Sequence, residues 1–206
     1  IYIDFEGNAD APPTLLGVYV QDPDHGGTMR HLIHEPAFWP LGAALQSPSV
    51  AADEVVVTSL PSALDAIRHR ATTENRLVIS WSRREALAIR ESGCSDDTLH
   101  FFEEHLVDAK VIAKNCKRKA HPGHRWERLP RVGIHTLDRY MALVGYTVPT
   151  AHRPGKTGSR LRSIRARLES GKPLTRGLRA HWTKLLNHNF HDCAGLHAVT
   201  VTALGG

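Results

Sequence analysis

Two acids, Asp4 and Glu6, stand inside an apolar run at the start of the chain, IYIDFEG. The apolar residues of this run favour a β-strand, and Gly7 ends it. Side chains of a strand alternate between two faces, so Asp4 and Glu6 share one face while Ile3 and Phe5 share the other. Two like charges side by side repel each other, and a divalent cation between them removes the repulsion. The alternative is an ordinary strand with an acidic outer face.

A second group of chemically capable residues lies near the end of the chain, in LLNHNFHDCAGLHAVT. The stretch predicts a helix on which His188 and Asp192 stand one turn apart on the same face. A neutral imidazole near its usual pKa is a suitable general base, and the carboxylate beside it can hold a metal ion. His191 is a second candidate for the base. The alternative for Asp192 is a helix residue that faces solvent.

Two further acids follow predicted strands. Glu85 lies where an apolar strand runs into a helix, in LVISWSRREALAI, and is either a metal ligand or the partner of a neighbouring arginine. Asp108, in HLVDAKVIAK, is either an additional acid near the site or a helix-capping residue.

The elements that must position these residues follow from the apolar periodicity and the turn signals. The pattern predicts three strands in an antiparallel meander, a helix, a fourth strand and further helices: 1–7, 14–22, 29–36, 59–74, 76–82, 83–93, 95–109, 135–146 and 175–204. A helical crossover makes the fourth strand parallel to its neighbour. Residues 37–52 contain Pro and Gly and are left without an assigned element.

This order of elements, with an Asp-x-Glu pair on the first strand, resembles the ribonuclease H-like fold. More narrowly, the chain resembles the DEDD exonuclease superfamily, in its divergent bacterial branch of predicted ribonuclease H-like nucleases. Asp4 and Glu6 match the first acidic motif, Glu85 the second, and Asp192 the last metal-binding aspartate. The stretch HTLDRYMALVGY is similar to the segment that lies between the second and third motifs.

Two positions depart from the family pattern. Most members have Asp where this chain has Glu85. The last motif usually has Tyr four residues, or His five residues, before the aspartate, and here those positions hold His188 and Asn187. The general base therefore stays open between His188 and His191.

The resemblance implies an α/β, ribonuclease H-like fold. Its mixed sheet would have antiparallel strands 1–3 and a parallel fourth strand, flanked by helices, with a helical C-terminal third. It also implies one nuclease domain over residues 1–206, with a basic helical insertion at about 114–184.

The implied activity is metal-dependent hydrolysis of phosphodiester bonds, as a 3′–5′ exonuclease. Two divalent cations about 3.5–4 Å apart activate the water and stabilise the leaving oxygen. Mg²⁺ and Mn²⁺ both prefer oxygen ligands, which carboxylates supply. The residues implied to hold the two ions are Asp4, Glu6, Glu85 and Asp192, and His188 would position or deprotonate the attacking water.

Histidines raise the alternative of a zinc site, since the chain has 14 of them. The tail alone holds His188, His191, Cys193 and His197. Their spacing matches no standard zinc finger, so the carboxylate site is favoured.

Positive charge gathers in two stretches of the chain. From Arg153 to Lys184 the only acid is Glu169, and a second basic cluster, from Lys114 to Arg131, surrounds Trp126. Basic residues neutralise phosphates and an aromatic ring can stack on an unpaired base, although a solvated charged face is the alternative. The residues predicted to bind DNA or RNA, at single-stranded ends, are Lys117, Arg118, Lys119, Trp126, Arg153, Lys156, Arg160, Arg162, Arg165 and Arg179. Residues 151–171, rich in Gly, Ser and Arg, are expected to be mobile until substrate binds.

Composition narrows the class of protein. Of 206 residues, 41% are hydrophobic and 23% are charged, which indicates a globular domain with a core. No apolar run approaches the roughly 20 residues of a membrane span, so no membrane partner is expected. The net charge of +5 favours a polyanionic partner. The absence of a signal-peptide pattern and the three widely spaced cysteines fit a reducing cytoplasm. A start in a strand without Met fits a domain of a larger polypeptide.

Three alternatives to the exonuclease use the same residues differently. A nucleic-acid-binding module of the same fold, without turnover, binds the backbone even in the presence of a chelator. A structure-specific endonuclease cuts substrates whose 3′ ends are blocked. A protein-interaction domain of a larger polypeptide has little affinity for any oligonucleotide.

Overall fold

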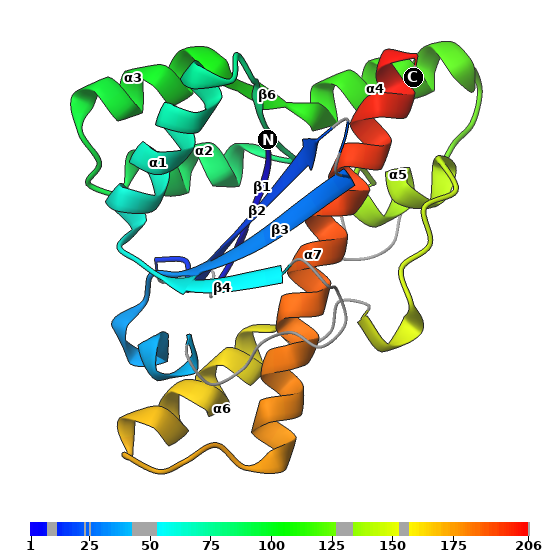
Figure 1. Ribbon diagram of the computed structural model, residues 1–206. Coiled ribbons are helices and arrows are strands. Elements are labelled where there is room, and N and C mark those ends of the chain that lie inside the picture. Colours follow the sequence, from blue (N-terminus) through cyan, green and yellow to red (C-terminus); the bar gives the residue numbers. More distant parts are fainter. Residues whose placement is uncertain are drawn as a thin grey trace.

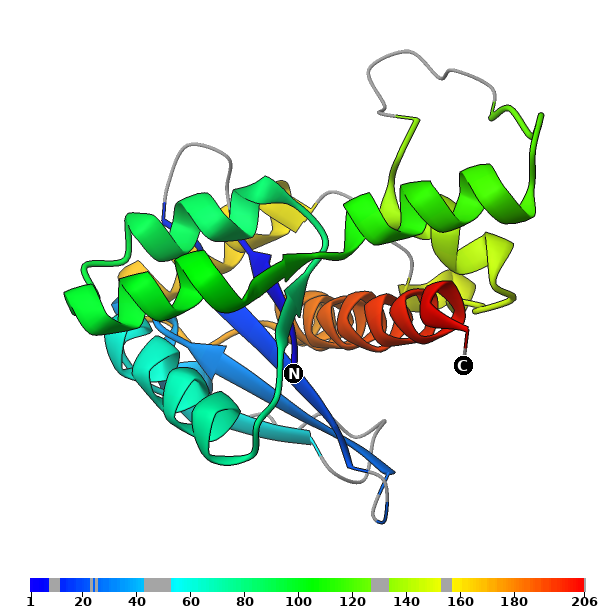
Figure 2. The ribbon, with the colours of Figure 1, turned by 90° about the horizontal axis from the view of Figure 1, so that it is seen from above.

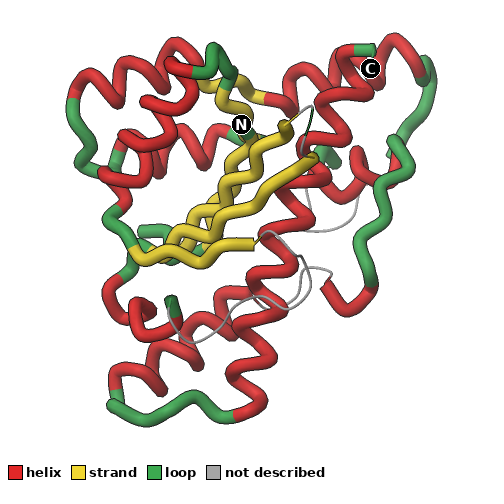
Figure 3. Tube along the Cα trace, viewed as in Figure 1, coloured by secondary structure: helices red, strands yellow, loops and turns green. Residues whose placement is uncertain are grey.

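The computed structural model describes residues 1–7, 12–22, 24, 26–42, 53–126, 134–152 and 157–205. A six-stranded sheet lies at its centre (Figures 1 and 3), in the order β4-β3-β2-β1-β5-β6. The strands are β1 (Tyr2–Glu6), β2 (Leu15–Asp22), β3 (Gly26–Ile33), β4 (Asp53–Val57), β5 (Val78–Ser80) and β6 (Leu106–Asp108). The pairs β1–β2 and β2–β3 are antiparallel, whereas β3–β4, β1–β5 and β5–β6 are parallel.

Helices cover both faces of this sheet. The described helices are η1 (Pro36–Leu41), α1 (Leu60–Thr73), α2 (Arg83–Arg90), α3 (Asp96–His105), α4 (Ala109–Ala120), α5 (Leu137–Leu143), η2 (Thr150–His152), α6 (Thr157–Glu169) and α7 (Arg176–Leu204). No helix of the described residues has the length and apolar character that crossing a membrane requires.

Polar side chains define where the helices begin. Ser59, Ser82, Ser95, Asp108 and Thr175 each precede a helix and accept a hydrogen bond from a backbone N–H of its first turn. Asp108 accepts from Lys110 N and Val111 N, so capping is the role that the structure gives to this acid.

The two faces of the sheet have separate cores. On one face, side chains such as Ile3, Leu16 and Val18 pack beneath α1, α2 and α3. On the other face, side chains such as Tyr2, Tyr19 and Met29 pack against the 29-residue helix α7. Figure 1 shows α7 running across the sheet, and this one helix contacts β1, β2 and β3.

The predicted α/β class, the antiparallel strands 1–3 and the helical C-terminal third are confirmed. The predicted fourth strand is β5, which follows the helix α1 and pairs in parallel with β1 through Tyr2 and Ile79. The last residues of the predicted element 95–109 form β6 instead of helix, and this strand extends the sheet beyond β5.

One strand was not predicted. β4 is only five residues long, DEVVV, and begins with two acids, so neither its length nor its pattern indicated a strand. It pairs in parallel with β3, from Met29–Asp53 to Ile33–Val57. Of the unassigned stretch 37–52, residues 37–41 belong to η1, and 43–52 lie outside the described residues.

The expectation of a mobile stretch at 151–171 is wrong for residues 157–169, which form α6. Leu161 and Ile164 of this helix are fully buried and belong to the same core cluster as Trp182 of α7. The helical spacing of these two apolar residues is hard to recognise in the sequence because Arg and Ser residues surround them. The described residues of the basic insertion, 114–184, contain helices and connections.

Candidate metal centre

The two acids of β1 face α7. Ile3 and Phe5 point to the opposite side, into the core beneath α1, as the alternation of strand side chains predicts. Asp4 accepts a hydrogen bond from the side chain of Asn189, and Glu6 lies beside His188. The first strand and the last helix therefore bring the two ends of the sequence together at one site.

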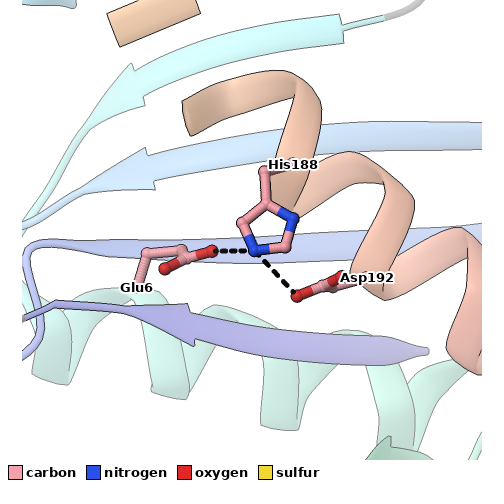
Figure 4. A group of neighbouring side chains, drawn as sticks. All are labelled: Glu6, His188 and Asp192. Atoms are coloured by element: carbon pink, nitrogen blue, oxygen red, sulfur yellow. Dashed lines mark ion pairs between the residues drawn. The ribbon is translucent and has the colours of Figure 1, made fainter. Parts of the chain in front are cut away.

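His188 lies between two carboxylates (Figure 4). Its Nε2 atom is 3.6 Å from Oε1 of Glu6 and 3.5 Å from Oδ2 of Asp192. Within the described residues, the group found suitable for a metal ion is formed by these three side chains, whose ligand atoms lie within 4.8 Å of one another. The predicted one-turn spacing of His188 and Asp192 thus places both side chains on the face of α7 that looks toward β1.

Burial raises the pKa values of the neighbouring carboxyl groups. The pKa of Asp4 is raised well above its usual value by burial and by the charges of Asp192 and Glu6. Burial also raises the pKa of Glu6 to about 7, against a smaller opposing effect of Arg84. The pKa of Asp192 is raised by burial, then by Glu6 and Asp138. Carboxyl groups crowded in this way hold protons near neutral pH unless a cation replaces them.

His188 is held in its neutral form. Burial, helped by the positive charges of Arg160 and Lys184, lowers its pKa to about 4. Its Nδ1 atom is buried and has no hydrogen-bond partner in the described structure, while Nε2 points at the acids. A neutral imidazole retains a lone pair that can accept a proton, and the lowered pKa makes this one a weaker base than a free histidine.

Asn189 fixes the orientation of Asp4. This fully buried amide donates from Nδ2 to Oδ2 of Asp4 at 2.8 Å and to the backbone oxygen of Asp4 at 3.2 Å. Its Oδ1 atom lies 3.2 Å from Nδ1 of His31, another fully buried residue. Because Nδ2 donates to Asp4, Oδ1 is the acceptor and Nδ1 of His31 is the donor.

Gly17 leaves room for this amide. The strand register pairs Asp4 with Gly17 and Gly17 with His31, so the three residues form a row across β1, β2 and β3. A Cβ atom on Gly17 would lie 2.1 Å from Oδ1 of Asn189. Sequence reasoning did not identify this row; the one available signal was a histidine at an inward position of an apolar strand.

Glu85 is hydrogen-bonded to Ser82, and its charge also affects the acids of the site. Its Oε2 atom accepts hydrogen bonds from the backbone N–H of Ser82 at 2.9 Å and from the Ser82 hydroxyl at 2.7 Å, which completes a capping box. Its charge nevertheless raises the pKa values of Asp4 and Asp192. Asp138 of α5, which sequence reasoning missed, also raises the pKa of Asp192.

His191, the second candidate for the base, has both ring nitrogens engaged away from the acids. Nδ1 lies 3.0 Å from the Tyr146 hydroxyl, and Nε2 lies 3.0 Å from Nδ1 of His152. Cys193 is fully buried in the core, and His197 packs edge-on against Tyr2. The histidines and cysteine of the tail therefore lie in different surroundings, and His188 is the one of them that belongs to the metal-capable group found among the described residues.

The three carboxylates fit a divalent cation. Asp4, Glu6 and Asp192 are hard oxygen donors, the ligands that Mg²⁺ and Mn²⁺ prefer. Their crowding and burial are unfavourable without a positive charge, as their raised pKa values show. Imidazole nitrogen is a poorer ligand for these two ions, although His188 also belongs to the group whose atoms could share a metal ion.

The predicted nucleic-acid-binding residues lie on two separate helical regions. Lys117, Arg118 and Lys119 lie in the last turn of α4, whereas Arg160, Arg162 and Arg165 lie on α6 and Arg179 lies in the first turn of α7. Arg165 forms an ion pair with Glu35 at 2.7 Å, so Glu35 neutralises part of its charge. Arg153 and Lys156 lie outside the described residues.

Trp126 packs rather than standing free. Its ring lies 4.7 Å from the ring of Tyr140 at 75°, and Nζ of Lys117 sits 4.6 Å above its centre. The ring thereby positions Lys117 through a cation–π contact. The predicted stacking of a base on Trp126 requires Lys117 to move from this place.

Comparison of the chain with protein-family models, with curated proteins and with solved structures finds no match.

The raised pKa of Glu6 predicts how stability without metal depends on pH. The folded state binds the Glu6 proton more tightly than the unfolded state, whose value is near 4.5. This contribution is fully present below pH 4.5 and is lost as the pH rises through about 7. In a chelator, we expect the melting temperature of wild type to fall more steeply over this range than that of Glu6→Gln. Glu54→Gln, which removes an exposed acid paired with Arg30, should keep the wild-type slope; parallel curves for Glu6→Gln and wild type would contradict the assignment.

The contact of Gly17 with Asn189 predicts that mutations of these two residues have non-additive effects on metal binding. Gly17→Ala should displace Asn189, and Asn189→Ala removes it, so each should weaken Mn²⁺ binding by about 10–100-fold, the usual cost of losing a group that orients a metal ligand. The double variant should bind Mn²⁺ no more weakly than Asn189→Ala, because both changes act through the same side chain.

Calorimetric titration of the four proteins with Mn²⁺ measures this cycle. Gly177→Ala is the matched glycine control, since a Cβ there meets nothing closer than 4.0 Å. Additive losses in the double variant would show that Gly17 does not act through Asn189.

Proposed function

We propose that this protein is a nuclease that hydrolyses phosphodiester bonds with two Mg²⁺ or Mn²⁺ ions. The observation that carries the proposal is the group of Glu6, neutral His188 and Asp192, whose ligand atoms lie close enough to share a metal ion, with Asp4 held near it by Asn189. Bound ions would stabilise the charge that develops on the phosphate and lower the pKa of the attacking water.

The residues of the site have separate roles in this proposal: they hold the ions, accept a proton or orient a carboxylate. Asp4, Glu6 and Asp192 hold the ions, with Glu85 adding negative charge from the start of α2. His188 takes the proton of the attacking water at its ring nitrogen, because burial keeps the imidazole neutral. Asn189 keeps the Asp4 carboxylate in one orientation, so the site needs little rearrangement when substrate arrives.

The strand arrangement supports a ribonuclease H-like nuclease. Three antiparallel strands, a helical crossover and a strand parallel to β1 are the features on which the resemblance to the DEDD exonucleases rests. The acids of β1 and the His188–Asp192 pair of α7 meet at one site, as the first and last motifs of that superfamily imply. By this resemblance the reaction is 3′–5′ exonucleolytic, in a reducing cytoplasm that keeps the cysteines free.

DNA or RNA with a single-stranded end is the proposed substrate. Arg160 and Lys184 are close enough to His188 to shift its pKa, so positive charge lies beside the acids where a phosphate would enter. Phosphate contacts from such cations supply affinity without sequence preference.

Cleavage assays test this function directly. We expect wild type to degrade end-labelled single-stranded DNA or RNA with Mn²⁺ or Mg²⁺, and not with EDTA. Asp4→Asn and Asp192→Asn should each lower the rate by about 10³-fold or more, since several kcal/mol of charge stabilisation are lost. His188→Gln should lower it by about 10²–10⁴-fold, the usual contribution of a general base. Glu103→Gln, an exposed acid of α3, is the matched control and should retain wild-type activity.

The same assay separates the alternatives. Cleavage of a substrate with a blocked 3′ end would establish an endonuclease in place of an exonuclease. Binding that survives EDTA, without cleavage under any condition, would replace the nuclease by a binding module. Absence of both binding and cleavage would contradict the proposal and favour a protein-interaction domain.

A further inference from the structure

One face of α4 carries a row of cations. Lys110, Lys114, Lys117 and Arg118 recur at intervals of four, three and one residues, and this set is called the α4 basic face below. At about 100° per residue, these side chains fall within a sector of roughly 100°. Ala109 and Ala113 are buried on the side of the helix next to this sector. Figure 2 shows α4 beside the C-terminal part of α7, which α4 contacts.

No carboxylate neutralises the α4 basic face in the described part of the chain. The polar partners of its side chains are uncharged: Lys117 donates to the backbone oxygen of His124, and Arg118 donates to Oδ1 of Asn115. Other cations of the described structure, such as Arg30 and Arg165, pair with glutamates. Like charges one turn apart destabilise a helix, so this row favours an external anion.

Two hollows adjoin the α4 basic face. One, of about 510 Å³, is lined by basic or neutral residues, among them Lys114, Lys117, Arg118, His121, His124 and His135. The other, of about 480 Å³, is lined by residues that include Ser82, Arg83, Arg84, Asp108, Lys110 and Lys114. Asp108 is the one acid in either lining, and its Oδ1 atom accepts the capping hydrogen bonds of α4.

The two hollows are neighbours along α4, because Lys114 lines both of them. The second hollow is also lined by Ser82, the N-cap of α2, and by Arg84 of its first turn. These two residues act on acids of the site: Ser82 donates to Glu85, and Arg84 lowers the pKa of Glu6. From Lys110 to His121 the helical rise covers about 16 Å, which suits an extended polyanion better than one phosphate group.

We infer that the α4 basic face and its two hollows bind the phosphodiester backbone of single-stranded nucleic acid and lead that strand to the carboxylate site. The inference rests on the proposed function and adds the route of the substrate. Hollows of this size accommodate nucleotide-sized groups, and the row of cations gives one phosphate contact after another. Lys117, held over Trp126, is the best-positioned member of the row.

Binding measurements with a double variant test the route. Fluorescence anisotropy is measured with oligothymidylates and oligouridylates of several lengths, in proteins that carry Asp192→Asn so that the strand stays intact. Lys114→Gln with Lys117→Gln should weaken binding about tenfold or more at low salt. The slope of log affinity against log salt should become less steep by about 1.4, since each phosphate contact of a single strand contributes about 0.7. The loss should grow with the length of the oligonucleotide.

Lys172→Gln is the matched control. Lys172 is an exposed lysine in the segment between α6 and α7, and Figure 1 shows this segment at the end of the molecule away from α4. Its loss should leave affinity and salt slope unchanged. Equal melting temperatures of the variants exclude unfolding as the cause of a loss.

Failure of the route and failure of the nuclease give different results. If wild type cleaves but the double variant binds like the control, the route is overturned and the nuclease stands. If the double variant loses binding but wild type never cleaves, the route stands without the nuclease. If the starting protein binds no oligonucleotide, the route is overturned.

Discussion

The burial or partial burial of several acids between β1 and α7, together with the electrostatic repulsion between them, is the constraint on which the arrangement of the site depends. Burial raises the pKa values of Asp4, Glu6 and Asp192, and neighbouring acids raise those of Asp4 and Asp192 further. In the described structure, none of the three is paired with an arginine or lysine. A fold that kept such a group for stability alone would gain by replacing it with apolar residues. The proposed metal ions would supply the positive charge that these acids lack.

The surrounding structure limits this repulsion without abolishing it. Asn189 donates to Asp4, and Ser82 donates twice to Glu85, so two of the acids have neutral hydrogen-bond donors. Arg84 lowers the pKa of Glu6 from a distance. Full ion pairs would neutralise the acids and remove their affinity for a cation. Neutral donors orient a carboxylate and leave its charge available.

Helix α7 gives the site its rigidity because one continuous element performs three tasks. Trp182 and Leu185 anchor its first half against η1 and α6. His188, Asn189 and Asp192 then face β1, and Leu196 and Val199 pack against the sheet and against α4 and α5. The site is therefore fixed from both sides along the helix axis, and few adjustments of α7 can move His188 without disturbing a packed core.

Local patterns sufficed for the parts of the site that lie within one element. Alternation on β1 predicted that Asp4 and Glu6 share a face, and the one-turn spacing predicted that His188 and Asp192 do so too. The row of Asp4, Gly17 and His31 depends on the register of three strands, which no single stretch contains. The strand β4 was too short to show a period, and the buried pair Leu161 and Ile164 was hidden among arginines. Whether His188 or His191 faces the acids likewise required the packing of α7 against Tyr146 and His152.

Binding of metal ions by the acids of β1 and α7 is tested most directly by anomalous diffraction from crystals of the protein soaked in millimolar Mn²⁺. If these acids form the metal site, we expect anomalous peaks whose nearest protein atoms are carboxylate oxygens of Asp4, Glu6 and Asp192. Crystals that show no peak at these carboxylates, in a lattice that leaves the site open to solvent, would contradict a metal-dependent site.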